Sequence, residues 1–343
     1  MSFSAPPGAP APLLHGGGLD AARRRFPQAP QPWIDLSTGV NPHAYPLPPI
    51  APEAFTRLPD AGARAAAECA ARLAYGAPAH LSVIAGAGTQ AFIQLLPRLF
   101  PAQRVATLGF TYAEHGAAWA TSGAGVARVD TLAALGDADV AIIVNPNNPD
   151  GRLVDAEDIV ALGAAMGARG GLLIVDEAFV EASAAGVCAT PRAPAEGVVI
   201  LRSFGKAYGL PGVRLGFALC PPRYEAPLRA LLGPWSVSGP ALAIGAAALA
   251  DADWLAASRT RLAGESARLD ASLTQAGLAI IGGTFLFRLA ACDNAAALHD
   301  RLAAQGILTR PFPERPRWLR FGLPASPAAR ERLTRALELC NVG

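Results

Sequence analysis

Residues 198–216 read VVILRSFGKAYGLPGVRLG, and this stretch combines two features that determine the fold class. The continuous apolar run Val198–Leu201 predicts a strand buried on both faces, and a glycine-rich loop with Lys206 and Arg214 follows it directly. Similar runs, each followed by a turn or a helical stretch, occur at Leu81–Ala85, Arg104–Leu108, Val140–Val144 and Leu172–Val175. Buried strands that alternate with helices indicate an α/β protein with a mostly parallel sheet. Such sheets bind ligands beyond the carboxyl ends of their strands, so functional side chains are expected in the loops after these runs.

The rest of the chain predicts a second, smaller α+β domain. Helices are expected at 61–75, 89–100, 113–122, 156–168, about 240–276, 295–305 and 326–339, and further strands near 279–281, 285–289 and 318–321. Dense prolines predict an extended segment at about 30–60, and residues 1–12 form a low-complexity tail of Pro and Ala. We therefore divide the chain into an N-terminal arm (1–45), a large domain (46–240) and a C-terminal small domain (241–343).

Composition excludes several classes of protein. The 343 residues are 52% hydrophobic and 16% charged, with a net charge of +2, which allows a sizeable core and provides no basic stripe for nucleic acid. The five cysteines are widely separated and form no metal-binding spacing with the histidines. There is no run of 18 apolar residues and no signal-peptide pattern. These features predict a cytoplasmic protein without a structural metal and without a nucleic-acid or membrane partner.

Lys206 is the only lysine among 29 basic residues. Lysine and arginine substitute for one another at most solvated positions, so a site that retains the only lysine is expected to need an amine. A lysine can lose its proton and form a Schiff base, whereas a guanidinium stays protonated. The neighbours of Lys206 are small or aromatic rather than charged. We therefore predict that Lys206 is a nucleophile.

The glycine turn at 86–89 follows the first apolar run and opens a helix, which is a typical anion site. It matches the G-x-G-x-x-A pattern of dinucleotide-binding folds, but the expected acid at the end of the next strand is missing, because that strand is followed by Gly109. An ordinary tight turn is the other alternative.

Two polar motifs follow two further runs. Asn145–Gly151 reads NPNNPDG, a stiff turn whose amides can donate to a phenolate-like oxygen. Asp176 ends the run that starts at Leu172, and a buried carboxylate there needs a cationic partner such as a protonated ring nitrogen. A salt-bridged or capping Asp remains the alternative. After the strand at 198–201, the hydroxyl of Ser203 and the guanidinium of Arg214 suit a phosphate.

In this order and spacing, the motifs resemble those of the pyridoxal-phosphate-dependent class I/II aminotransferase family, over residues 30–340. The resemblance implies the aspartate-aminotransferase-like fold, a mostly parallel sheet between helices plus a small α+β domain, and pyridoxal 5'-phosphate bound covalently by Lys206. By this resemblance, Asp176 pairs with the ring nitrogen, Asn148 binds the ring hydroxyl oxygen and Tyr112 stacks on the ring. The cofactor phosphate is bound by Ala87, Gly88, Ser203 and Arg214. Arg320 binds the substrate carboxylate, and Asn148 also lies next to the substrate.

Three features resemble one branch of the family, which decarboxylates L-threonine O-3-phosphate in cobalamin biosynthesis and is close to the histidinol-phosphate aminotransferases. His15 in a His-Gly-Gly segment is implied to reach the substrate phosphate. Ser37 and Asn41, which lie in a similar Asp-x-Ser…Asn-Pro stretch, are implied to bind the substrate. Phe179 stands where many aminotransferases have a tyrosine. The partner implied is a small phosphorylated amino acid. An aminotransferase resembling those that act on histidinol phosphate is the alternative, since sequence does not show which Cα bond is broken.

The family resemblance also implies a homodimer. Leu58 stands where the family usually has a tyrosine that reaches the cofactor of the other subunit. One of the arguments for a homodimer is therefore missing in this sequence. A regulator that uses this fold only to sense a ligand carries a DNA-binding module before it. Only about 30 residues rich in Pro and Ala precede the resembling region, so we expect an enzyme.

Overall fold

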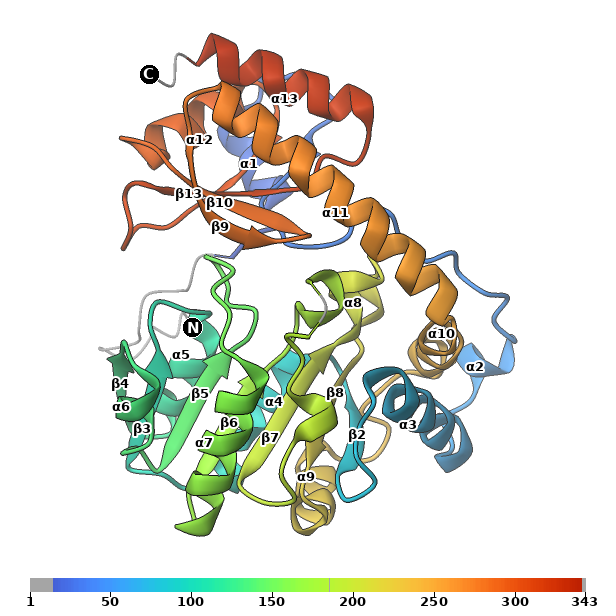
Figure 1. The fold of residues 1–343 in the computed structure, drawn as a ribbon. Helices are drawn as coiled ribbons and strands as arrows, with labels where there is room; N and C mark the ends of the chain where they lie inside the picture. The colour runs from blue at the N-terminus through green and yellow to red at the C-terminus, as the bar shows by residue number, and fades with distance from the viewer. Residues whose placement is uncertain (1–14, 185, 341–343) are drawn as a thin grey trace, which may run out of the picture.

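The computed structural model describes residues 15–184 and 186–340. The expected low-complexity tail at 1–12 lies outside the described residues. Figure 1 shows two lobes, a larger one around a seven-stranded sheet and a smaller one around a four-stranded sheet.

The large sheet confirms the expected α/β class. Its strands, in spatial order, are β2 (Ser82–Gly86), β8 (Gly216–Cys220), β7 (Val198–Ser203), β6 (Leu172–Asp176), β5 (Val140–Val144), β3 (Arg104–Leu108) and β4 (Gly125–Val129). All neighbouring pairs are parallel except those of β8, which is antiparallel to both β2 and β7. We had not expected β4 or β8 from the sequence. The loops after β5, β6 and β7 therefore meet at one edge, as parallel strands require.

Apolar layers cover both faces of this sheet. Ile142 and Ile174 belong to one buried cluster, and their neighbours Ile143 and Val175 belong to the other, because successive strand residues face opposite sides. The helices of this lobe are α3 (Ala61–Tyr75), α4 (Thr89–Leu99), α5 (Ala113–Thr121), α6 (Leu132–Leu135), α7 (Ala156–Ala168), α8 (Phe204–Ala207) and α9 (Glu225–Leu232), with α2 (Glu53–Thr56) and α10 (Gly239–Ala250) at the edge next to α3. The first cluster includes side chains of α4, α5 and α9, and the second includes those of α3, α7 and α10.

The small lobe combines the C-terminal elements with the start of the chain. Its sheet runs in the order β12 (Arg310–Pro311), β13 (Trp318–Gly322), β10 (Phe287–Ala291) and β9 (Ala279–Thr284), covered by α11 (Ala252–Gln275), α12 (Ala295–Ala304) and α13 (Pro327–Leu339). The short strand β1 (Ile34–Asp35) pairs with β11 (Ile307–Leu308), and the adjacent helix is α1 (Leu19–Arg25). The segment before residue 36 thus joins the small lobe, while the domain boundaries at 45 and 240 stay a prediction.

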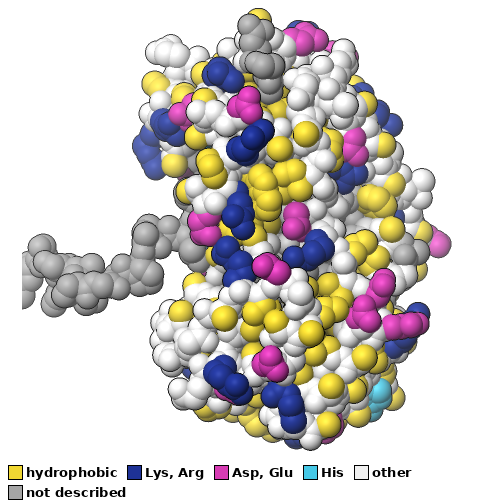
Figure 2. All heavy atoms as spheres, turned by 60° about the vertical axis from the view of Figure 1, so that its left-hand side comes forward, with side chains coloured by type: hydrophobic (Ala, Val, Ile, Leu, Met, Phe, Trp, Pro, Cys, Tyr) yellow, Lys and Arg dark blue, Asp and Glu magenta, His cyan; other side chains and the backbone are white. Residues whose placement is uncertain are grey.

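The expected long helix at 240–276 is two helices, α10 and α11, with a bend of 78° between them. The break lies at Asp251, whose carboxylate accepts from the backbone N–H of Trp254 at 3.0 Å and so caps α11. Within the described part of the chain no single helix is long and apolar enough to cross a membrane, although this bent pair together passes a test of length and composition. On the face shown in Figure 2, basic and acidic side chains are interspersed.

Candidate active site

A cavity of about 150 Å³ lies where β5, β6 and β7 end. The structure brings together seven of the side chains or backbones that the sequence singled out for cofactor binding, and they line this cavity: Gly88, Tyr112, Asn148, Asp176, Ser203, Lys206 and Arg214. Ala87 precedes Gly88 but is not one of the lining residues. The roles given to these residues remain predictions.

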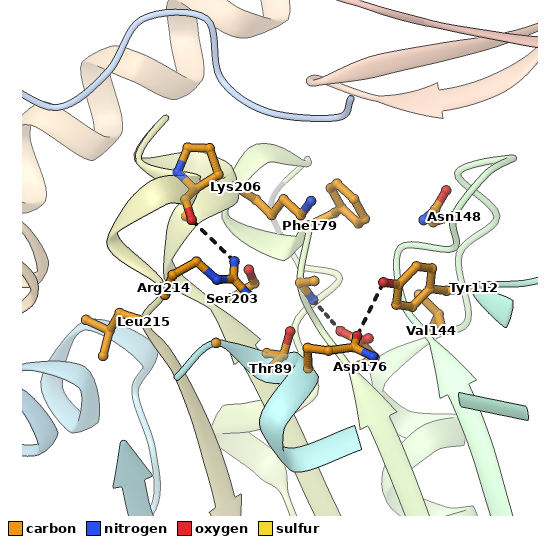
Figure 3. A pocket seen from close by; sticks show the side chains of 15 residues that line it. Thr89, Tyr112, Val144, Asn148, Asp176, Phe179, Ser203, Lys206, Arg214 and Leu215 are labelled. Atoms are coloured by element: carbon orange, nitrogen blue, oxygen red, sulfur yellow. Dashed lines mark hydrogen bonds between the residues drawn. The ribbon is translucent and has the colours of Figure 1, made fainter. Parts of the chain in front are cut away.

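Lys206 lies in the single turn of α8, directly after β7. The turn is tight, since a Cβ on Gly205 would lie 2.8 Å from the Cα of Pro211. Figure 3 shows the amine directed toward the ring of Phe179, and its Nζ is 5.7 Å from the ring centroid. Burial first, and then the Arg320 guanidinium, lowers the pKa of Lys206 to about 8, while Asp176 opposes the shift. A larger share of this amine is therefore neutral at physiological pH than for an exposed lysine.

Asp176, the last residue of β6, is fixed on both oxygens. Its Oδ1 accepts from the backbone N–H of Ala178 at 3.0 Å, and its Oδ2 is 2.8 Å from Nε2 of His115, which is also buried. Sequence analysis did not assign His115. Its signal was its place three residues after Tyr112 at the start of α5, which puts both on one side of a helix. With its lone pairs held in this way, the carboxylate has a fixed position next to the cavity.

Asn148 and Arg320 meet across the two lobes. The Arg320 guanidinium donates to Oδ1 of Asn148 at 2.5 Å and to the carbonyl of Ser37 at 2.8 Å. Its Nε is buried without a hydrogen-bond partner, and among the described residues no carboxylate forms an ion pair with it. Burial, and then the like charge of Arg310, lowers the pKa of Arg320 to about 9, so it is still charged at neutral pH. A buried cation with spare donors needs an anion.

Gly88 and Arg214 form a second anion site at the start of α4. Gly88 has φ +79° and precedes the helix, so the free N–H groups of the first turn face the cavity edge. Arg214 also has a left-handed backbone, with φ +55°, and its guanidinium would be 3.0 Å from a Cβ on Gly88. Figure 3 shows Arg214 and Ser203 on the same side of the cavity. This arrangement suits a phosphate group.

A second cavity of about 280 Å³ has His15, Ser37 and Arg310 among its lining residues. His15 is half-exposed, and its Nε2 lies 2.9 Å from Oε1 of Glu114. Ser37 is buried, with its hydroxyl between the N–H of Gly17 at 2.7 Å and the carboxylate of Asp35 at 2.5 Å. Arg310 was not assigned from sequence. Its signal was its place on the strand beside the one that carries Arg320, which it faces in the β12–β13 register.

Asn41 lies beside the turn that carries Lys206. Its side-chain amide donates to the carbonyl of Ala207 at 2.7 Å and to the hydroxyl of Ser258 at 2.9 Å, and its carbonyl oxygen accepts from the N–H of His43. Neither Asn41 nor Arg320 is a lining residue of the two cavities described above. The contact of Asn41 with the substrate stays a prediction.

The chemistry of the first cavity fits pyridoxal 5'-phosphate. The cofactor's aldehyde reacts with an amine, and its ring nitrogen pairs with a carboxylate. Its ring oxygen accepts a hydrogen bond from an amide, and its phosphate binds a guanidinium beside free N–H groups. The cavity supplies these as Lys206, Asp176, Asn148 and Arg214 with the start of α4. The match joins groups from four different loops.

Comparisons with known proteins agree with this chemistry. The family model "Aminotransferase class I and II" matches residues 33–338. A threonine-phosphate decarboxylase from Pseudomonas aeruginosa is 43% identical over 95% of this chain and 97% of its own length. Another, from a Sinorhizobium species, is 42% identical over 95% of this chain and 98% of its own.

Solved structures share the fold. Histidinol-phosphate aminotransferase from Sinorhizobium meliloti, solved with pyridoxal-5'-phosphate, superposes with a TM-score of 0.79 at 24% identity, covering 96% of this chain and 95% of that one. L-threonine-O-3-phosphate decarboxylase from Porphyromonas gingivalis gives a TM-score of 0.74 at 18% identity, covering 89% and 98%.

Proposed function

Because the chain belongs to the class I and II aminotransferase family, we propose that it uses pyridoxal 5'-phosphate to decarboxylate L-threonine O-3-phosphate. The product is (R)-1-amino-2-propanol O-2-phosphate. The observation that carries the proposal is that the amine of Lys206 and the amide of Asn148 line one cavity, and that Asn148 accepts from the buried guanidinium of Arg320. The chemistry needs both an amine and a carboxylate anchor. The two decarboxylase relatives, similar over nearly their whole length, support the choice of reaction.

The protein's part in the reaction is to bind, orient and move protons. Bound pyridoxal phosphate supplies an aldehyde that takes up an amine and a ring that accepts electrons. Asp176, held by His115, would keep the ring nitrogen of the bound cofactor protonated. Arg320 would orient the substrate carboxylate, and Lys206 would hold at Nζ the proton that is returned to the reacting carbon. When the bond from Cα to the carboxylate breaks, carbon dioxide leaves, and Lys206 or water returns one proton to Cα.

The second cavity suits the substrate phosphate. It carries His15 and Arg310, and it borders Ser37, whose carbonyl accepts from Arg320. A substrate whose carboxylate binds Arg320 can thus extend its phosphate toward these two side chains. This arrangement supports a phosphorylated amino acid as the substrate class.

An aminotransferase acting on a similar phosphorylated amine is the alternative. Product analysis separates the two reactions. The purified enzyme, incubated with L-threonine O-3-phosphate labelled in its carboxyl carbon, is expected to release labelled carbon dioxide without any added 2-oxo acid. Formation of a 2-oxo product that requires an added amino acceptor, with no labelled carbon dioxide, would reject the decarboxylase.

We further infer a homodimer that works in the cytoplasm, in cobalamin biosynthesis. The dimer is supported by exposed apolar side chains, Phe55 and Leu58 near α2 and Trp235 before α10, on elements that contact one another. Leu58 has no hydroxyl to offer the cofactor of a second subunit, so its expected contribution is apolar. Light scattering during gel filtration tests the dimer, and a monomer at micromolar concentration would reject it.

A further inference from the structure

Glu114, the second residue of α5, contacts a residue of each cavity, Gln90 of the first and His15 of the second. It accepts from the amide of Gln90 at 2.5 Å and from the amide of Gln94 at 3.4 Å, and its Oε1 lies 2.9 Å from Nε2 of His15. Its side chain is 14% exposed. A carboxylate that is removed from water to this extent needs such donors.

The partners of Glu114 come from both lobes. Gln90 and Gln94 lie on α4 of the large lobe, whereas His15 precedes α1 of the small lobe. The His15 segment is packed tightly against the small lobe, since a Cβ on Gly16 would lie 2.3 Å from the carbonyl oxygen of Ser37. That same carbonyl accepts from Arg320. The His15–Glu114 pair therefore attaches the segment that lines the second cavity to the large lobe.

The pair also fixes the ring of His15. With Nε2 2.9 Å from Glu114, the ring has its other nitrogen, Nδ1, available for a ligand. The ring stands edge-on to Tyr112, with centroids 6.4 Å apart. Gln90, the strongest partner of Glu114, in turn accepts from the hydroxyl of Tyr112 at 3.4 Å.

From these contacts we propose that Glu114 is a positioning residue for the substrate phosphate, which it serves by holding His15 at the wall of the second cavity. The inference rests on the proposed function for the identity of the phosphate-bearing ligand. Glu114 itself does not contact the ligand. Its effect passes through His15, so removing either residue should have the same consequence.

The test is a double-mutant cycle with Glu114→Gln and His15→Ala in the holoenzyme. Glu114→Gln should raise the KM for L-threonine O-3-phosphate about fivefold to tenfold and change kcat less than about twofold, the size expected for a lost charge-assisted hydrogen bond. The double variant should be no worse than His15→Ala alone, because both changes remove one interaction. An unchanged or lower KM in Glu114→Gln, or two effects that multiply, would overturn the proposal.

The chain offers a matched control in a second histidine–glutamate pair. Nε2 of His43 lies 2.8 Å from Glu265, whose side chain is 15% exposed, and neither residue lines the two cavities. Glu265→Gln should leave the KM unchanged, and a rise equal to that of Glu114→Gln would overturn the proposal. Titration calorimetry with inorganic phosphate needs no turnover and should show weaker binding in Glu114→Gln. A wild-type enzyme that releases no carbon dioxide but shows this difference would reject the proposed function and keep the positioning role.

Discussion

Lys206 is held in a position that disfavours its charge. Its pKa of about 8, compared with 10.5 for a free lysine, has burial as its largest cause and the positive charge of Arg320 as the next. In the cofactor-free protein this arrangement costs stability, and in the working enzyme it makes the amine reactive. The same burial that we expect to make the amine reactive therefore lowers the free energy of unfolding.

The penalty predicts how stability depends on pH. The pKa of Lys206 is lower in the folded state than in the unfolded state, so the unfolded state binds more protons between about pH 8 and pH 10.5. Lys206 therefore lowers the free energy of unfolding fully below pH 8, and this penalty disappears as the pH rises to about 10.5. We expect Lys206→Met to raise the free energy of unfolding of the cofactor-free protein by about 2 kcal/mol at pH 7 and by little near pH 10.5. Urea unfolding at both pH values measures this, and an equal effect at the two would contradict it.

Asp176 gives a second prediction at this scale. Asp176→Asn should keep a hydrogen bond to His115 but removes the negative charge that we propose holds a proton on the ring nitrogen. We expect kcat to fall about 100-fold or more with the fold intact, as for loss of a charge that acts on the reacting system. Asp139→Asn, at an exposed ion pair with Arg104, is the control. A loss of kcat smaller than threefold for Asp176→Asn in steady-state kinetics would contradict the proposed role of Asp176.

Sequence was informative where a functional side chain directly follows a buried strand. Lys206, Asp176 and Asn148 could be predicted to meet because parallel strands end at a common edge. His115 and Glu114 could not be assigned, because they lie on a helix whose orientation depends on packing, and no motif marks them. The hydrogen bonds of Asn41 to Ala207 and Ser258 could not be predicted either, because a polar residue in a resembling segment says nothing about which groups occupy its amide.

At the scale of elements, β9 of the small lobe contacts the loop at 145–151 through backbone. A Cβ on Gly282 would lie 2.2 Å from the carbonyl oxygen of Asp150, and one on Gly151 would meet the backbone of Gly283 at 2.1 Å. The same loop carries Asn148, the partner of Arg320. The absence of side chains at this contact thus allows the two lobes to approach closely enough for Asn148 and Arg320 to meet.

Gly282→Ala tests this contact, since Gly282 does not have a left-handed backbone and the change adds only a methyl group. The methyl must push β9 away from the loop, so we expect the KM for the substrate to rise about tenfold and stability to fall by about 1–3 kcal/mol. Gly264→Ala in α11 has room for its methyl group and should be neutral or slightly stabilising. Kinetics indistinguishable from wild type for Gly282→Ala would show that the contact does not set the spacing.

Some helices and strands were predicted from the sequence more accurately than others, for physical reasons. Long runs with clear periodicity, such as α3 and β5, were predicted close to their observed ends. The apolar run Gly216–Cys220, which forms β8, was overlooked because it follows the Arg214 motif without a helix between, as an antiparallel strand can. The bend at Asp251 was missed because alanine-rich sequence continues on both sides of it.

At the scale of the whole molecule, the proposed reaction uses both lobes (Figure 1) and the start of the chain. In the proposal, the large lobe supplies Lys206 and Asp176, the small lobe supplies Arg320, and the residues before α1 supply His15. Binding of one small molecule that touches all three should therefore hold the lobes together. The bond that is broken depends on how these separate parts orient the substrate.

The most direct test follows the hydrogen atoms at Cα when L-threonine O-3-phosphate reacts in deuterium oxide. We predict that the aminopropanol phosphate formed has one deuterium, in the position vacated by the carboxylate, and keeps its original α-hydrogen, while recovered substrate stays unlabelled. Mass spectrometry and proton NMR measure both. Deuterium in place of the α-hydrogen of recovered substrate, without carbon dioxide, would show that the enzyme breaks the Cα–H bond and would contradict the account.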